Sequence, residues 1–188
     1  MKKRILLLAL AAMMLVSSCG KPKDNPDAQN NLYAVEPEEE VDPFYAEMKE
    51  KEHVRPIAVM IDNEKTALPH YGMNSADVVY EMMNSTLNGR ITRFMVLVKD
   101  WENIKQLGSI RSVRPTNILI ASEWNAVICH DGGPFYIDEY MADPSVDNFS
   151  GTFSRVDNGK SREYTEYILP GDLDKNFENS GVSKEYTS

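Results

Sequence analysis

The fold of this chain is decided by residues 108–133, which read GSIRSVRPTNILIASEWNAVICHDGG. Proline is favoured in the first turn of a helix, so Pro115 predicts that a helix begins there. The apolar run AVIC that follows the helix is short and partly β-branched, which indicates a buried strand ending at His130 and a glycine pair. Arg111 and Arg114 precede the helix start. We therefore expect both arginines and His130 near one edge of a sheet.

This arrangement makes the arginine pair the best candidate for a binding site. Unpaired N–H groups and the positive end of the helix dipole favour an anion at a helix start, and guanidinium groups present donors suited to phosphate or carboxylate. We predict an anion site at Arg111, Ser112 and Arg114, with His130 close by. In the alternative, Arg114 pairs with a carboxylate such as Asp62 or Asp131, and His130 is a satisfied residue at a strand end.

A second apolar run, VRPIAVMID at residues 54–62, predicts a buried first strand with Asp62 at its carboxyl end. Binding sites of α/β sheets tend to form beyond the carboxyl ends of strands, so Asp62 is a further candidate ligand-binding residue. Asp-Asn sequences also initiate turns. The alternative is that Asp62 only shapes the turn that begins with Asn63.

The runs 78–83 and 91–98 flank Asn88-Gly89, which is a strong signal for a two-stranded hairpin. We expect these runs to pair antiparallel. Glu81 and Arg93 are predicted to face each other across the hairpin as a structural ion pair.

Three further local predictions complete the fold. Residues 134–140 suggest a short helical segment, and DNGK at residues 157–160 suggests a second hairpin. The helix that begins at Pro115 is expected to bury one face, formed by Ile118, Leu119, Ala121 and Ser122. The predicted fold class is α/β, a mixed sheet with an antiparallel hairpin and flanking helices, truncated at the C-terminus.

The composition fits one ordinary domain with unstructured length. The chain has 188 residues, 42% of them hydrophobic, and a formal charge of −9. Removal of the three basic residues in the leader described below gives −9 − 3 = −12 for the mature chain. Such an acidic surface repels phosphate backbones and disfavours a nucleic-acid partner. Cys129 is the single cysteine of the expected globular part and is interpreted as a small core residue.

The first 18 residues are typical of a bacterial lipoprotein signal peptide. The basic start MKKR is followed by an apolar run at residues 5–16, which is too short to span a membrane. The run ends in VSSCG, which resembles the lipobox, so we expect Cys19 to carry acyl chains such as palmitate after cleavage. This places the protein on the extracytoplasmic face of the cell membrane, held through its lipid anchor. The alternative is a secreted protein with an incidental cysteine.

We divide the rest of the chain into three parts. Residues 19–52 are rich in Pro, Asn, Asp and Glu and are predicted to form a disordered acidic tether. Within the tether, residues 45–51 are compatible with a short helix, although a solvated charged run is preferred. Residues 53–170 form the predicted globular domain. Residues 171–188 are predicted to be the polar start of a missing C-terminal part.

Five phrases, in this order, resemble the YerB-type bacterial lipoproteins, a family whose conserved domain is of unknown function: RPIAVMIDN (55–63), SADVVYE (75–81), GRITRF (89–94), GSIRSVRP (108–115) and AVICHDGG (126–133). Family members are longer, which implies that this chain is an N-terminal fragment. The family's PHNLYT-like phrase is YTEYI at residues 164–168 here. The histidine of that phrase is absent, so any family site that uses it is in doubt for this chain.

Two functions are compatible with these features. The first is a binding or accessory protein of the cell envelope with an anion site, for which a phosphorylated cell-wall component is a candidate ligand. The alternative is an enzyme that acts on a phosphorylated or lipid-linked cell-wall precursor, suggested by a loose similarity in element order to the LytR-CpsA-Psr phosphotransferases. Hydrolase-elbow, zincin and P-loop patterns do not occur. The histidines at 53, 70 and 130 lack metal-ligand spacing, so we assign no metal and no cofactor.

Overall fold

The computed structural model describes residues 42–86 and 89–186. The predicted signal peptide, Cys19 and most of the predicted tether lie outside these residues. The strands are β1 (Ile57–Asp62), β2 (Val78–Met83), β3 (Thr92–Val98), β4 (Leu107–Gly108), β5 (Val127–His130), β6 (Asn148–Ser150), β7 (Ser154–Arg155) and β8 (Glu166–Ile168). The helices are α2 (Pro43–Glu50), α3 (Pro115–Glu123), α4 (Asp138–Met141) and α5 (Asp172–Ser180), with 3-10 turns at Lys65–Ala67, Met73–Ser75, Trp101–Asn103, Phe135–Ile137 and Arg162–Tyr164.

The larger sheet has the strand order β2-β3-β1-β5-β6. β1, β5 and β6 run parallel to one another, whereas β3 is antiparallel to both of its neighbours. The mixed sheet confirms the predicted α/β class. The pairing of β2 with β3 confirms the first hairpin, although residues 87–88 of its turn lie outside the described part.

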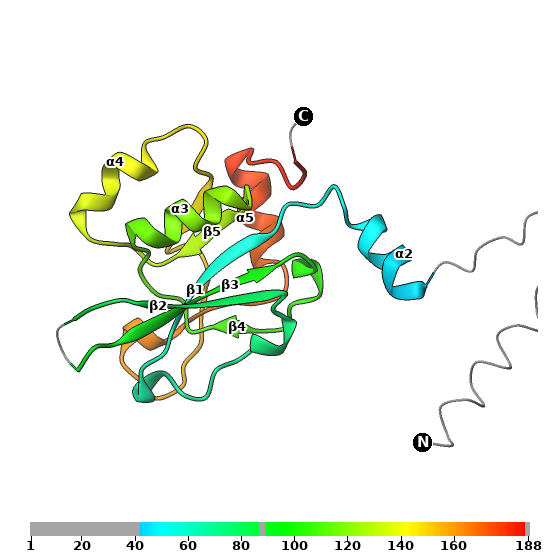
Figure 1. Cartoon of the computed structure of the whole chain (residues 1–188). Helices are drawn as coiled ribbons and strands as arrows, with labels where there is room; N and C mark the ends of the chain where they lie inside the picture. The colour runs from blue at the N-terminus through cyan, green and yellow to red at the C-terminus, as the bar shows by residue number, and fades with distance from the viewer. Residues whose placement is uncertain (1–41, 87–88, 187–188) are drawn as a thin grey trace, which may run out of the picture. The chain divides into compact units, whose positions relative to one another are not determined.

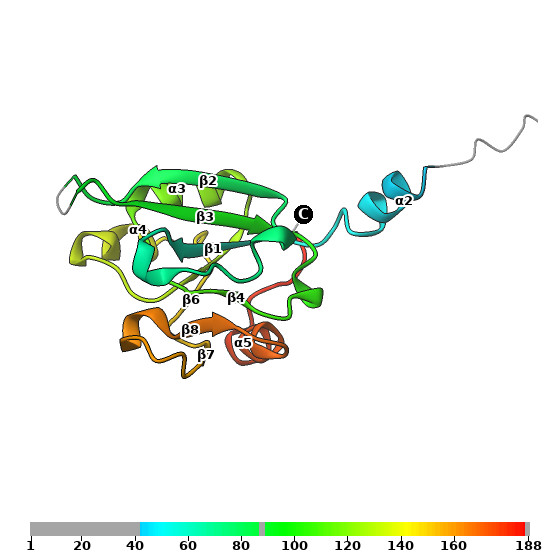
Figure 2. The same ribbon diagram turned by 90° about the horizontal axis from the view of Figure 1, so that it is seen from below.

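β1 lies at the centre of this sheet because its residues are apolar in both side-chain directions and are covered on both faces. Ile57, Val59 and Ile61 belong to one core cluster, and Ala58 and Met60 to the other. Helices α3 and α4 lie on one side of the sheet, and the small sheet β4-β8-β7 and α5 lie on the other (Figures 1 and 2). The molecule is therefore layered around β1.

Helix α3 begins at Pro115, as predicted, but its buried face differs from the expected one. Ile118 and Ala121 are buried together with Asn117. Leu119 is 58% exposed, and Ser122 is exposed as well. The expectation for these two residues was wrong because each successive residue turns by about 100° around the helix axis, which places them on the outer side.

Both ends of the described chain hold helices where polar segments were expected. Residues 43–50 form α2, so the preferred interpretation of a solvated charged run was wrong there. Beyond residue 170, α5 contributes Leu173 and Phe177 to the core, so the packed core continues past the expected domain boundary.

The second hairpin and the short helical segment are confirmed. β7 pairs antiparallel with β8, and a 3-10 turn with α4 covers residues 135–141. Cys129 is buried in the core, and burial raises the pKa of its thiol. This supports the interpretation of Cys129 as a small core residue.

Candidate functional site

The carboxyl end of β1 is completed by the arginine-containing stretch and not by β5. β5 pairs with β1 only as far as Val59. Beyond that point Ile110 pairs with Ile61, and the Arg111 N–H donates to the carbonyl of Met60 at 2.9 Å. The stretch also joins the loop after β5, because the N–H of Asp131 donates to the Arg111 carbonyl at 3.1 Å. These backbone bonds bring residues 109–113 between the ends of two parallel strands.

Arg111 lies among carboxylates. Its Nε is 2.7 Å from Oδ2 of Asp62, an ionic contact that lacks the alignment of a hydrogen bond. Its Nη1 donates to Oε2 of Glu163 at 2.9 Å and to the Glu163 carbonyl at 3.0 Å. The guanidinium lies over the ring of Tyr164, 5.0 Å from its centroid. Two protein carboxylates therefore hold positions that the oxygens of an anionic ligand would otherwise take.

Asp62 both shapes the turn after β1 and pairs with an arginine, which are two of the roles considered from sequence. Its side chain is fully buried, and its Oδ1 accepts a hydrogen bond from the Glu64 N–H at 2.8 Å, which is a turn-initiating contact. His70 Nε2 lies 2.8 Å from the Asp62 carbonyl. The predicted alternative placed Asp62 opposite Arg114, but the arginine that pairs with it is Arg111.

Arg93 enters the same region from β3, opposite Asp62 in the β1–β3 register. It is 4% exposed, its Nη1 donates to the Ser112 carbonyl at 2.6 Å, and its Nε has no hydrogen-bond partner. Burial lowers the pKa of Arg93 to about 10, with a raising effect from Asp62 and lowering effects from Arg114 and Arg111. The side chain remains charged at neutral pH.

The predicted ion pair between Glu81 and Arg93 was wrong. Arg93 pairs with Met82 in the β2–β3 register, whereas Glu81 pairs with Phe94. Glu81 therefore lies on the other face of the sheet, because successive strand residues point to opposite faces. Its Oε1 accepts hydrogen bonds from Asn63 at 3.1 Å and from Thr92 at 2.7 Å.

Arg114 precedes α3 and completes a group of arginines that we call the arginine cluster: Arg93, Arg111 and Arg114. Its N–H donates to Oδ1 of Asn117 at 2.9 Å, which caps the helix start. Its Nη1 donates to the neighbouring Val113 carbonyl at 2.9 Å. Within residues 42–86 and 89–186, Arg114 has no carboxylate partner. It is thus the least neutralised cation of the cluster.

His130 is held at the end of β5 by its own surroundings. Its Nδ1 lies 2.8 Å from the Gly132 carbonyl, and its Nε2 lies 3.3 Å from Oδ1 of Asn148. Burial lowers its pKa, with smaller raising effects from these two contacts and from Asp131. These contacts correspond to the alternative of a satisfied strand-end residue, and the described structure gives His130 no direct contact with the arginine cluster.

A second charged group lies next to His130 and was missed by sequence reasoning. Nη2 of Arg155 donates to Oδ2 of Asp131 at 2.9 Å and to Oε2 of Glu166 at 2.7 Å. Glu166 is fully buried, and burial with a hydrogen bond to Asp131 raises its pKa to about 7. The pKa of Asp131 is lowered through Arg155 and Glu166, against the raising effect of its own burial. A signal existed, because Arg155 and Glu166 are cross-strand partners in the predicted second hairpin.

The described residues contain neither a cluster of metal ligands nor a membrane-spanning helix. No group of three or more His, Cys, Asp or Glu side chains is arranged to hold a metal ion. None of the helices in this part of the chain is long and apolar enough to cross a membrane.

The fold and the charged residues beyond β1 define the chain as an α/β domain with a cluster of charged residues at the carboxyl end of its central strand. Residues 45–183 match the family described as "Protein of unknown function (DUF3048) N-terminal domain". This match covers well over half of the chain, so the chain belongs to this family.

Two comparisons confirm the resemblance to YerB-type proteins. The chain is 27% identical over 176 residues to "Putative lipoprotein YerB" of Bacillus subtilis (strain 168), which covers 89% of this chain and 50% of that protein. The chain thus spans about half the length of this curated relative. The crystal structure of YerB protein from Bacillus subtilis has a TM-score of 0.65 at 22% identity, covering 73% of this chain and 48% of that one. This structural similarity shows that the two chains share a fold.

Proposed function

We propose that this protein is a lipoprotein on the extracytoplasmic face of the cell membrane that binds an anionic ligand at the arginine cluster. The observation that carries this proposal is the positive charge of Arg93 and Arg114, which the carboxylates of the described residues do not neutralise as they neutralise Arg111. Arg93 is buried with an unpartnered Nε, and Arg114 has no carboxylate partner in the described part of the chain. An anion beside Arg114 would satisfy donors that the protein leaves unused, and it would also be attracted by the charge of the buried Arg93.

The members of the predicted site take different roles in this proposal. Arg114 and the start of α3 would bind the anion directly, next to Ser112. Arg111 is held by Asp62 and Glu163, so Asp62 would position Arg111 and not contact the ligand. His130 would support the loop after β5 through its bond to the Gly132 carbonyl. Arg93, which was not in the predicted site, would contribute positive charge from its buried position on β3.

The alternative of an enzyme acting on a phosphorylated or lipid-linked precursor has less support. Proton transfer needs a general acid or base that reaches the substrate and has a pKa near the working pH. Among the described carboxyl groups, Glu166 has a pKa raised to about 7, but its side chain is fully buried. A phosphorylated cell-wall component is therefore proposed as a bound ligand.

The anion site is tested by replacing Arg114 with alanine. We expect R114A to weaken the binding of inorganic pyrophosphate about tenfold, because one charge-assisted contact is lost. The melting temperature should stay unchanged, since the cap formed by the Arg114 N–H remains. Isothermal titration calorimetry measures the first effect, and thermal unfolding measures the second.

K105A is the matched control, because it removes one exposed positive charge outside the cluster. It should leave both binding and stability unchanged. Equal pyrophosphate binding by R114A and the unchanged protein, or no binding by either, contradicts the proposed anion site.

Lipid anchoring is tested at Cys19. We expect C19A to leave the protein unprocessed or released from the membrane, because the acylated thiol is lost. Membrane fractionation and labelling with radioactive palmitate measure the result. C129A is the control, since Cys129 is buried in the core and should not affect anchoring. Normal processing and unchanged fractionation of C19A would reject the anchor.

A further inference from the structure

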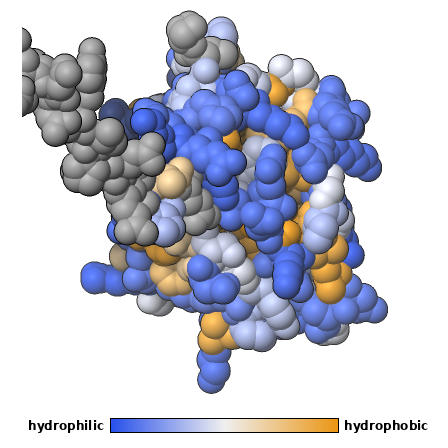
Figure 3. Space-filling view, turned by 90° about the vertical axis from the view of Figure 1, so that its right-hand side faces the viewer, coloured by the Kyte–Doolittle hydropathy of each residue, from blue (hydrophilic) through white to orange (hydrophobic). Residues whose placement is uncertain are grey.

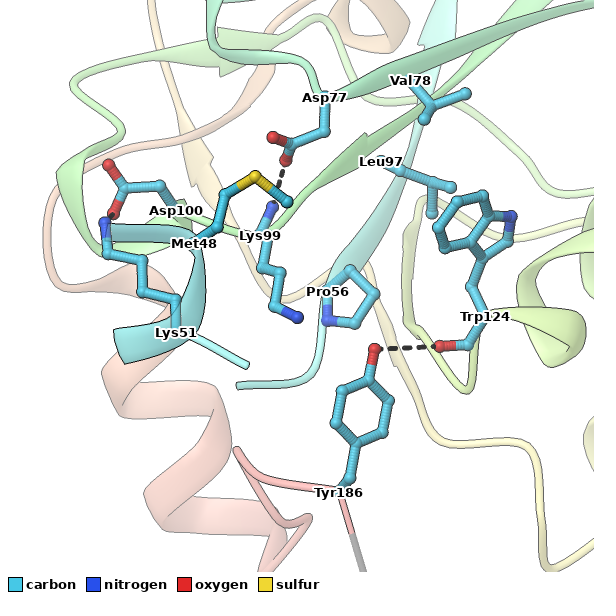
Figure 4. A pocket seen from close by; sticks show the side chains of 10 residues that line it. All are labelled: Met48, Lys51, Pro56, Asp77, Val78, Leu97, Lys99, Asp100, Trp124 and Tyr186. Carbon is cyan, nitrogen blue, oxygen red and sulfur yellow. Dashed lines mark hydrogen bonds and ion pairs between the residues drawn. The ribbon is translucent and has the colours of Figure 1, made fainter. Parts of the chain in front are cut away.

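A cavity of about 490 Å³ lies at the opposite end of β1 from the arginine cluster. One of its lining residues, Pro56, directly precedes β1, whereas the arginine cluster lies around the carboxyl end of β1. This volume is in the range of pockets that hold small molecules. Figure 4 shows the ten lining side chains: Met48, Lys51, Pro56, Asp77, Val78, Leu97, Lys99, Asp100, Trp124 and Tyr186.

The wall of this cavity is mostly apolar. Pro56, Val78 and Leu97 supply aliphatic surface. Two aromatic rings extend it, and their polar atoms are engaged with protein groups. The Trp124 Nε1–H donates to the hydroxyl of Tyr80 at 3.1 Å, and the Tyr186 hydroxyl donates to the Trp124 carbonyl at 3.5 Å. The rings therefore offer their apolar faces to a ligand.

The surroundings of the cavity are polar. Where it is not covered by grey atoms, the face that holds the start of β1 and the end of β3 is largely hydrophilic, with hydrophobic residues scattered among the polar ones (Figure 3). A ligand that buries an apolar body in the cavity would thus meet polar groups and water at its mouth.

The four charged lining residues differ in how they are neutralised. Lys51 and Asp100 form an ion pair at 2.5 Å. Asp77 accepts the main-chain N–H of Lys99 through Oδ2 at 2.6 Å. The Lys99 Nζ donates to the Glu52 carbonyl at 3.2 Å and lies 5.5 Å from the centroid of the Tyr186 ring.

Among these four charged groups, the Lys99 ammonium is the one that can pair with a ligand. Neither a carbonyl nor a ring neutralises it, and it has no carboxylate partner among the described residues. In Figure 4 its side chain extends toward Pro56 and Tyr186, away from the carboxylate of Asp77. An apolar wall with one such ammonium is complementary to an apolar chain that ends in a carboxylate.

We propose that this cavity binds a free medium-chain fatty acid, with the alkyl chain against Leu97, Val78 and Trp124 and the carboxylate at Lys99. Burial of the alkyl chain supplies most of the binding free energy, and the ammonium selects the acid over uncharged amphiphiles. This site is separate from the proposed anion site, because the two share no residues. Either one can fail in experiment without the other.

The chain carries its own reporter for the test. Of its two tryptophans, Trp124 is 41% exposed at the cavity and Trp101 is 2% exposed in the core. We expect a saturable change of tryptophan fluorescence on titration with decanoate, and a weaker response to decanol. W124F should remove the signal, while calorimetry shows that the variant still binds decanoate.

Substitutions of Lys99 test whether its ammonium binds the carboxylate. K99M keeps the aliphatic stem and should weaken decanoate binding about tenfold, so that decanoate and decanol bind alike. K99R keeps the charge and should retain the preference for decanoate, and R114A should leave decanoate binding unchanged. The absence of saturable decanoate binding, or a preference for decanoate that survives in K99M, overturns the proposal.

Discussion

Replacement of Arg111 by methionine is expected to lower the free energy of unfolding by about 3–5 kcal/mol. Asp62 is fully buried, and Arg111 Nε lies 2.7 Å from its carboxylate. Without the guanidinium the buried Asp62 carboxylate has no cation in contact among the described residues, and the Glu163 side chain loses its cationic partner. Urea unfolding followed by circular dichroism measures the change.

Arg114 provides the matched control for this result. R114M removes the same kind of side chain three residues away, but its guanidinium has no carboxylate partner in the described structure, so we expect a change within about 0.5 kcal/mol. The double variant D62N/R111M should lose less stability than the sum of the single variants, because both act on one interaction. A loss below about 1 kcal/mol for R111M would show that the pair is not a structural element.

The contribution of Glu166 to stability is expected to fall as the pH rises from about 4.5 to about 7. The folded-state pKa of Glu166 is raised from 4.5 to about 7, so the folded protein holds a proton that the unfolded chain has released. Its contribution is therefore complete below pH 4.5 and is lost as the pH passes 7.

The variant E166Q separates this effect from other titrations. Glutamine keeps the shape and a hydrogen-bond donor but does not titrate, so E166Q should lack the decline that Glu166 causes between pH 5 and 7 and should be more stable than the unchanged protein at pH 8. Asp131 and His130 both have lowered pKa values and act in the opposite sense, Asp131 below its ordinary value of 3.8 and His130 below its ordinary value of 6.5. Identical profiles for the two proteins from pH 5 to 7 would contradict the role of Glu166. Urea unfolding at each pH provides the measurement.

The sequence was sufficient for elements that depend on local rules. The apolar run before Asp62 indicated a buried strand, and Pro115 marked the start of α3. The position of the hairpin between β2 and β3 followed from the Asn-Gly turn signal. Each of these features is determined by neighbours within a few residues along the chain.

The face that a residue occupies was harder to predict from sequence. Glu81 and Arg93 were expected to pair, yet the register places them on opposite faces of the sheet. A shift of one residue in register reverses the direction of every side chain, and a turn signal alone does not specify the register. Likewise, Leu119 was expected inside the core and is exposed on the outer side of α3.

The sequence by itself determined the α/β class, the antiparallel hairpin, the start of α3 and the presence of two arginines before it. Tertiary structure decided which arginine is neutralised. Arg111 lies in an extended segment paired with β1, so its side chain reaches Asp62, whereas Arg114 lies at the helix start without a carboxylate partner in the described part. Sequence spacing does not distinguish them, because the deciding contact joins residues far apart in the chain, and its geometry depends on which strands lie side by side.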